Sequence, residues 1–222
     1  MRLYLSSDRI GDRVGALLAL VGFGARAAII PNALDGVSPT AREIYRNEVY
    51  DPFAQLASIG IGAEELDLRA YFGRPGTLAA DLGRYELVWV MDGNVFTLRR
   101  AMKQSGFDAV ITQMLDRDAI VYGGFSAGAV VVGPSLEGFE HFDDPGEQPL
   151  GYAPGPVLGG LGLIDFSIVP HVGSAHPEAD AAKRITRYLA KRHRPFRALR
   201  DGEVVVWTGP RTSAAAELRR IA

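Results

Sequence analysis

Apolar residues recur along the chain in two alternating patterns. Short runs of aliphatic and β-branched residues, such as residues 27–30 and 86–91, are typical of strands that are buried on both faces of a sheet. Between these runs, leucine and alanine recur at the spacing of a helix that packs one face against a core. The alternation predicts an α/β fold, with a mostly parallel sheet and helices on both of its faces.

The same patterns, with glycine and proline as end signals, give the expected elements. The predicted strands cover residues 2–6, 27–30, 66–68, 86–91, 119–122 and 163–169. The predicted helices cover residues 11–20, 39–59 with a break at Pro52, 77–82, 95–104, 107–115 and 177–193. Asp201-Gly202 predicts a hairpin turn between strands at 197–200 and 204–207, and residues 213–222 fit a helix or an edge strand. No repeat or linker interrupts the chain, so residues 1–222 are predicted to form a single domain.

Composition narrows the class of protein. The 222 residues are 47% hydrophobic and 23% charged, with a formal net charge of -2, which is typical of a soluble globular protein without a nucleic-acid or membrane partner. The absence of cysteine excludes disulfides, thiolate catalysis and cysteine-bound zinc. Glycine and proline interrupt the uncharged stretches 119–136 and 148–164, and the N-terminal residues do not resemble a signal peptide. We therefore expect a cytoplasmic protein without a transmembrane segment.

Residues 119–132 carry the strongest local signal. The apolar run 119–122 ends in two glycines, and the residues after Ser126 are small and compatible with a helix. Gly124-Phe125-Ser126-Ala127-Gly128 is the Gly-x-Ser-x-Gly pattern of a nucleophile elbow, a sharp turn from strand to helix that exposes the serine oxygen. Ser126 is therefore the candidate nucleophile.

A serine nucleophile needs a general base near it. His171 directly follows the predicted strand 163–169, and loops at the carboxyl ends of parallel strands gather on one edge of a sheet. His171 is therefore the candidate base. His176 lies just before the predicted helix and is a candidate for the helix start or for a substrate contact.

The acid that would orient the base has two possible origins. Asp143 or Asp144 would give the chain order Ser, Asp, His of the α/β-hydrolases, whereas Asp201 would give Ser, His, Asp. The spacing of these residues leaves both alternatives open.

Asp92-Gly93-Asn94 follows the predicted strand 86–91. A glycine at this place lets a backbone amide approach a reacting carbonyl, so Gly93 and Ala127 are the candidate oxyanion-hole donors, and Asn94 is a candidate substrate contact. No histidine pair has the helical spacing of a metal site, and no phosphate-binding loop is present. We therefore expect neither a metal nor a cofactor.

Motifs across the chain carry a family resemblance. They are the segments 3–7, Gly93-Asn94, 124–129, 160–166, Pro170-His171 and 199–202. Together they resemble the peptidase E (aspartyl dipeptidase) family of serine peptidases, whose fold is similar to that of class I glutamine amidotransferases. The resemblance implies Ser126 as the nucleophile, His171 as the base, and Gly93 and Ala127 as the oxyanion donors. It also favours Asp201 as the acid, because a hairpin turn holds a carboxylate more firmly than a Gly/Pro-rich loop; Asp144 and Asp143 are the reserves.

Two departures from the family pattern concern specificity. The family commonly has glycine where this chain has Asp92, which adds a charge near the oxyanion site. The family's preference for aspartate is linked to an arginine early in the helix after the histidine, and its nearest counterpart here is Ala181. Arginine can bind a substrate carboxylate through two parallel hydrogen bonds, so the absence of this arginine leaves the Asp-X preference open.

The main hypothesis is a serine peptidase, a monomer or homodimer, that cleaves dipeptides or short peptides at the N-terminal end through an acyl-enzyme, with Asp-X among its candidate substrates. One alternative is an α/β-hydrolase-like esterase that uses Asp143 or Asp144. The other is a non-catalytic module that binds a small molecule or a partner on the same scaffold.

Overall fold

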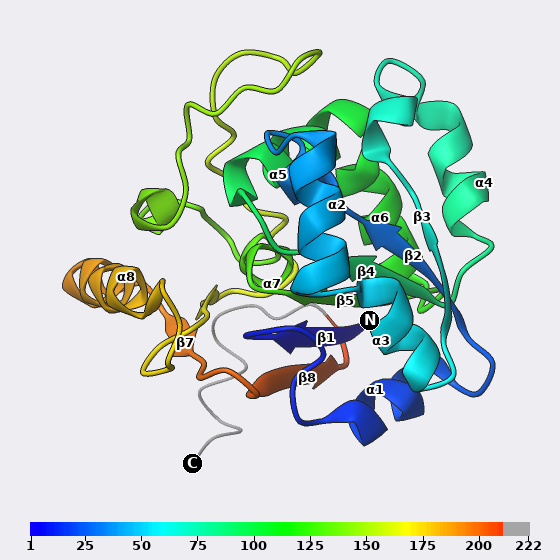
Figure 1. Ribbon diagram of the computed structural model, residues 1–222, viewed down its shortest axis with the longest axis horizontal. Coiled ribbons are helices and arrows are strands. Elements are labelled where there is room, and N and C mark those ends of the chain that lie inside the picture. Colours follow the sequence, from blue (N-terminus) through cyan, green and yellow to red (C-terminus); the bar gives the residue numbers. More distant parts are fainter. Residues whose placement is uncertain (211–222) are drawn as a thin grey trace.

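A central six-stranded sheet organises residues 1–210, the part of the chain that the computed structural model describes (Figure 1). The strand order is β3-β2-β4-β5-β1-β8. Neighbouring strands run parallel, except that β8 pairs antiparallel with β1 at the edge. Helices cover both faces of the sheet, so the predicted α/β fold is confirmed.

The strands of this sheet are β1 (Arg2–Ser6), β2 (Arg26–Ile30), β3 (Gly62–Glu65), β4 (Leu87–Val90), β5 (Val121–Phe125) and β8 (Val204–Thr208). A separate parallel pair consists of β6 (Ser167–Val169) and β7 (Phe196–Ala198). The helices are α1 (Val14–Val21), α2 (Pro39–Glu48), α3 (Pro52–Ser58), α4 (Leu78–Leu82), α5 (Val95–Ser105), α6 (Phe107–Asp116), α7 (Ala127–Val130) and α8 (Ala179–Lys191). Short 3-10 turns occur at η1 (Asn32–Leu34), η2 (Leu68–Tyr71), η3 (Pro75–Thr77) and η4 (Phe139–His141).

Two apolar cores lie on opposite faces of the central sheet. Successive residues of β1 divide between them: Tyr4 packs with α1 and α3, whereas Leu3 packs with the helices α4 to α8. Ile168 of β6 and Leu199, the residue after β7, also belong to the second core. Burial on both faces explains why the strands appear in the sequence as continuous apolar runs.

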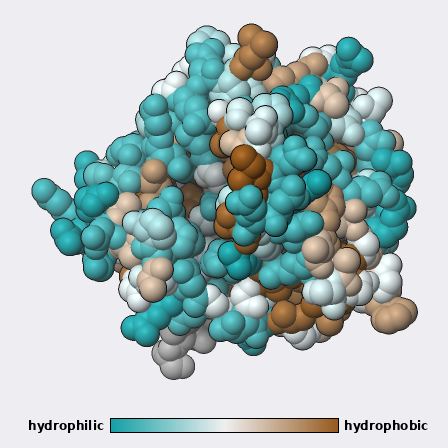
Figure 2. Space-filling model, viewed as in Figure 1, coloured by the Kyte–Doolittle hydropathy of each residue, from teal (hydrophilic) through white to brown (hydrophobic). Residues whose placement is uncertain are grey.

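Most of the face shown in Figure 2 is hydrophilic, with apolar side chains gathered over α1 and along α2. On α2, Ile44 is 51% exposed. Within residues 1–210, no helix combines the length and apolarity needed to cross a bilayer.

Local end signals fix several helices where the sequence predicts them. Ser38 caps α2 by accepting the backbone N–H of Ala41 at 3.3 Å, and Pro39 is the first residue of that helix. Pro52 begins α3, as the predicted break requires. The remaining helices agree with the predicted ranges to within a few residues at each end.

Three strand predictions are wrong in part. The strand expected at 66–68 is instead β3, because residues 62–65 pair with β2, and Asp67 accepts the N–H of Arg69 to begin η2. The strand expected at 163–169 is confined to β6. The predicted hairpin around Asp201-Gly202 does not form, because β7 pairs with β6 and β8 pairs with β1. The prediction for residues 213–222 lies outside the described residues.

Candidate active site

Ser126, His171 and Asp201 form a continuous hydrogen-bonded row. His171 Nε2 lies 3.1 Å from Ser126 Oγ, and His171 Nδ1 lies 2.7 Å from Asp201 Oδ1. With the Nδ1 proton on the carboxylate side, Nε2 is free to accept the serine hydroxyl proton. Ser126 and His171 are only 4% and 1% exposed, so the nucleophile and the base are screened from bulk water.

Ser126 occupies the sharp turn between β5 and α7. Its backbone angles, φ 45° and ψ -114°, are strained for a residue other than glycine, and such strain is common at functional sites. A Cβ on Gly128 would lie 2.3 Å from the carbonyl oxygen of Val90, and one on Gly124 would lie 2.8 Å from that of Gly128. Close backbone approach therefore requires both glycines of the motif, as the elbow interpretation predicts.

His171 and Asp201 are held by two serines that the sequence analysis did not select for the site. Ser7 accepts the backbone N–H of His171 at 2.9 Å and donates its hydroxyl proton to Asp201 Oδ1 at 3.0 Å. Ser174 accepts the backbone N–H of Asp201 at 2.8 Å. Ser7 follows β1 directly, so the strand-end rule that selected His171 could have found it as well.

The two alternative acids lie away from the base. Asp143 accepts the backbone N–H of Val95 at 2.9 Å, at the start of α5. Asp144 accepts the N–H of Gly146 at 2.8 Å within its own loop. The structure thus brings Asp201, and neither Asp143 nor Asp144, into contact with His171.

Asn94 serves the start of α5 in the structure. Its side-chain oxygen accepts the backbone N–H groups of Phe96 and Thr97, and its amide donates to the carbonyl of Asp144 at 2.9 Å. Both ends of this amide are therefore engaged within the protein. A substrate contact by Asn94 stays a prediction.

The two candidate oxyanion donors lie on one pocket beside Ser126. Gly93 has φ +135°, and a Cβ there would lie 2.6 Å from the carbonyl oxygen of Ala33, so the position requires glycine. The backbone N–H of Ala127 donates to Asp92 Oδ1 at 3.3 Å. One of the two predicted oxyanion donors therefore already donates its hydrogen bond to a carboxylate.

This pocket is acidic. Its lining includes three carboxylates, those of Asp92, Asp143 and Glu178, and the rings of Phe139 and Phe142. Burial raises the pKa of Asp143 to about 7. Burial, followed by repulsion from Asp92, also raises the pKa of Glu178 above its ordinary value. The space next to the nucleophile is thus poorly suited to a further negative charge.

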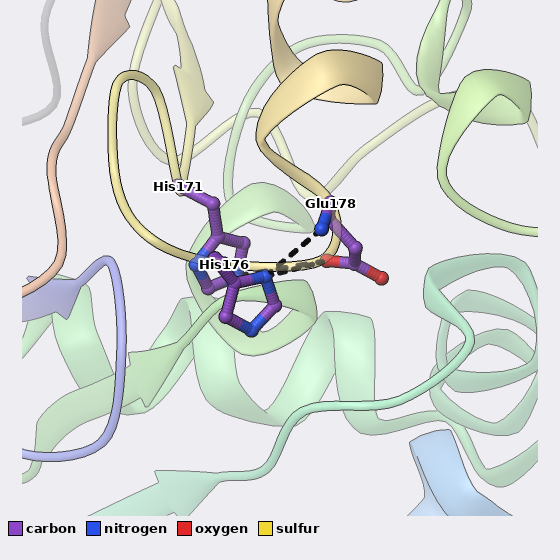
Figure 3. Close-up of side chains that lie close together, drawn as sticks. All are labelled: His171, His176 and Glu178. Atoms are coloured by element: carbon purple, nitrogen blue, oxygen red, sulfur yellow. Dashed lines mark hydrogen bonds and ion pairs between the residues drawn. The ribbon is translucent and has the colours of Figure 1, made fainter.

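His176 stacks face to face on His171, with ring centroids 3.7 Å apart and an interplanar angle of 9°. Figure 3 shows the two rings with the Glu178 carboxylate beside them, 3.7 Å from His171 Nε2. Burial and the charge of His171 lower the pKa of His176, which favours its neutral form. The structure therefore places His176 at the site, where a substrate contact stays a prediction.

His171, His176 and Glu178 are close enough together to be considered as a metal site. However, His176 Nδ1 accepts the backbone N–H of Glu178 at 3.2 Å, and His171 Nε2 faces Ser126. A shared ion must also lie near the plane of each imidazole ring, which two stacked parallel rings do not allow. This arrangement fits a metal poorly, and the absence of a metal stays a prediction.

An α/β fold that brings serine, histidine and aspartate into one hydrogen-bonded row defines the class of serine hydrolases. Within that class, the model of peptidase family S51 matches residues 9–214, and the chain therefore belongs to this family of serine peptidases. The resemblance to peptidase E is thereby confirmed.

Curated relatives agree with this assignment. The chain is 28% identical to an uncharacterised peptidase of Listeria monocytogenes over 61% of its own length and 63% of the relative's. It is also 28% identical to an uncharacterised peptidase of Pasteurella multocida, over 66% of the chain and 68% of the relative. The alignments thus span about two thirds of these relatives.

The fold is similar to that of a Listeria monocytogenes protein provisionally named peptidase E, with a TM-score of 0.68 and 23% identity over 96% of this chain and 98% of the other. It is also similar to a peptidase from an acI-B1 Actinobacterium, with a TM-score of 0.63 and 15% identity over 93% and 82% of the two chains. At these identities the likeness shows the fold.

Proposed function

We propose that this chain is an active serine peptidase that hydrolyses dipeptides or short peptides at their N-terminal end. The observation that carries the proposal is the row of Ser126, His171 and Asp201 in a member of peptidase family S51. The compartment proposed for this activity is the cytoplasm, and the active form is a monomer or a homodimer. No nucleic-acid or membrane partner is part of the proposal.

In the proposed reaction, Ser126 Oγ attacks the scissile carbonyl carbon while His171 Nε2 takes the hydroxyl proton. His171 then gives this proton to the leaving amine, which departs and leaves the first residue esterified to Ser126. A water molecule attacks this ester with His171 again as the base, and Ser126 Oγ leaves with the proton. Asp201 holds the Nδ1–H tautomer and stabilises the imidazolium that forms at each step.

The same proposal gives Gly93 and Ala127 the task of stabilising the tetrahedral intermediate. Their backbone N–H groups would bind the oxygen that becomes negatively charged during attack, and one such donor contributes roughly 3 kcal/mol. The contact between Ala127 and Asp92 has to break for this to happen.

The esterase alternative required Asp143 or Asp144 as the acid, and both carboxylates are engaged elsewhere. A non-catalytic binding module remains the rival, because a carboxylate occupies one oxyanion donor. The two possibilities differ in whether Ser126 is an activated nucleophile.

Labelling with a fluorophosphonate tests this difference, because the probe reacts with an activated serine whatever the substrate preference. We expect one adduct on Ser126, found by mass spectrometry of tryptic peptides, and none in Ser126→Ala. Hydrolysis of Asp-X, Glu-X, Ala-X and Lys-X dipeptides, followed by chromatography, then measures the activity. Folded wild-type protein that takes up no label would favour the binding module.

A further inference from the structure

Asp92 occupies a position that the proposed reaction needs. The backbone N–H of Ala127 donates to Asp92 Oδ1 at 3.3 Å. During attack by Ser126, the substrate's acyl oxygen needs this donor and becomes negatively charged. A carboxylate at the same amide competes for the hydrogen bond and repels the developing charge. Asp92 therefore has to leave the amide before the reaction can proceed.

The charges around Asp92 indicate what would draw it away. Asp143 and Glu178 line the same pocket, and its lining contains no lysine or arginine. Among residues 1–210, Asp92 forms no ion pair that would balance its charge. The pocket next to the nucleophile therefore has an excess of negative charge, and a cationic group of the substrate would offset it.

A peptide with a free N-terminus has such a group at the right place. Its ammonium nitrogen is two covalent bonds from the carbonyl carbon that Ser126 attacks, a separation of roughly 2.5 Å. An ammonium there comes within reach of a carboxylate that lies at the Ala127 amide. The walls formed by Phe139 and Phe142 limit the water available to the pair, which strengthens the attraction.

We propose that Asp92 is a specificity-determining residue that selects substrates with an ammonium group next to the scissile carbonyl. When such a substrate binds, the carboxylate moves from the Ala127 amide to the ammonium, and the freed amide binds the acyl oxygen. This ammonium is the α-amino group of the first residue. A lysine side chain at that residue, long enough to fold back toward the carboxylate, is the other source of an ammonium that the test has to separate. This inference rests on the proposed function, and it disfavours Asp-X, whose side chain adds a further carboxylate.

Four coumarylamides separate the two sources of the ammonium: those of alanine, N-acetylalanine, Nα-acetyl-lysine and aspartate. For the wild type we expect kcat/KM on the alanine amide to exceed that on the N-acetylalanine amide by about tenfold or more. A preference for Nα-acetyl-lysine over N-acetylalanine would assign the ammonium to the side chain. In Asp92→Ala, the ratio between substrates with and without the ammonium should fall by about tenfold.

Asp143→Asn, assayed above the pKa of Asp143 so that the wild-type group is ionised, is the matched control, because it removes a carboxylate from the same pocket without freeing the Ala127 amide. It should change the ratio much less than Asp92→Ala does. An equal fall in both variants would overturn the proposal, because net charge and not the position of Asp92 would then set the preference. Asp92→Asn, which keeps the shape of the side chain, replaces Asp92→Ala if the latter does not fold.

Labelling by a neutral fluorophosphonate separates this inference from the proposed function. Because the probe has no ammonium, it should label Asp92→Ala about threefold faster than the wild type, through the freed amide. An equal labelling rate together with an unchanged substrate ratio would overturn the role of Asp92 alone. Absence of label in the wild type would instead contradict the role of Ser126.

Discussion

The turns that follow β4 and β5 lie side by side on the same edge of the sheet, yet they differ in how ready they are for chemistry. The turn after β5 holds Ser126 in a strained conformation between glycines that have no room for a side chain. Its hydroxyl already faces His171. The turn after β4 holds Asp92 on the amide that the reaction needs.

The difference separates two tasks within one site. The nucleophile, its base and the acid are preorganised in the absence of substrate, so no part of the row has to move. The oxyanion site is completed only when Asp92 moves, which couples catalysis to the chemistry of the substrate. The turn after β5 therefore supplies the nucleophile, and the turn after β4 determines which substrates react.

Replacement of Ser126 by alanine tests the first turn most severely. Without the nucleophilic oxygen, kcat for peptide hydrolysis should fall by about 10⁶, whereas the fold should be retained. Steady-state hydrolysis and circular dichroism measure the two properties. A folded variant that retains more than about 0.1% of the wild-type rate would contradict the assignment.

Asp201→Asn should lower kcat by about 10⁴, because an amide can stabilise the unproductive tautomer of His171. Asp144→Asn is its control, since Asp144 is exposed and its carboxylate accepts the N–H of Gly146 within its own loop. We expect this control to stay within about threefold of the wild type. The opposite order of effects, measured as kcat on one dipeptide, would restore the α/β-hydrolase arrangement.

Gly128→Ala should affect stability, because its Cβ would lie 2.3 Å from the carbonyl oxygen of Val90. We expect a loss of about 3 kcal/mol in the free energy of unfolding, measured by urea denaturation. Asp92→Ala in the neighbouring turn should change this free energy by less than about 0.5 kcal/mol. Equal losses of unfolding free energy in the two variants would contradict the view that the turn after β5 is tightly packed and the turn after β4 is adaptable.

Asp143 gives the smallest effect, a pH dependence of stability. Because burial raises the pKa of Asp143 to about 7, the folded state binds its proton more tightly than the unfolded state does. Stability from this group is therefore present at low pH and is lost as the pH rises from about 4 to about 7. In Asp143→Asn, the loss of unfolding free energy between pH 5 and pH 8 should shrink by about 2 kcal/mol, as pH-dependent denaturation would show. An identical pH profile in variant and wild type would contradict the raised pKa.

Features that depend on local chemistry were predictable from the sequence. The elbow needs only a strand followed by a serine with glycines two positions before and two after it, so the backbone around Ser126 follows from its neighbours. The position of His171 also followed, because it lies just after the end of a strand. The α/β fold followed from the alternation of apolar runs and helical spacing.

Features that depend on pairing between distant segments were not predictable. Asp-Gly between two apolar runs has the same local signal whether the runs pair with each other or with different partners, which is why the hairpin at Asp201 was wrong. The contact of Asp92 with Ala127 depends on the register of β4 against β5. Likewise, Ser7 reaches Asp201 only after β1 is placed beside β5 and β8.

The catalytic row depends on both sheets, so its activity depends on how the two sheets are held together. Ser126 belongs to the six-stranded sheet, His171 follows the last strand residue of β6 closely, and Asp201 lies on the link from β7 to β8. If the small sheet separates from the large one, the row is broken although most of the hydrophobic core is intact. Heat inactivation should then precede the global melting transition, so that partly unfolded molecules lose activity before they aggregate.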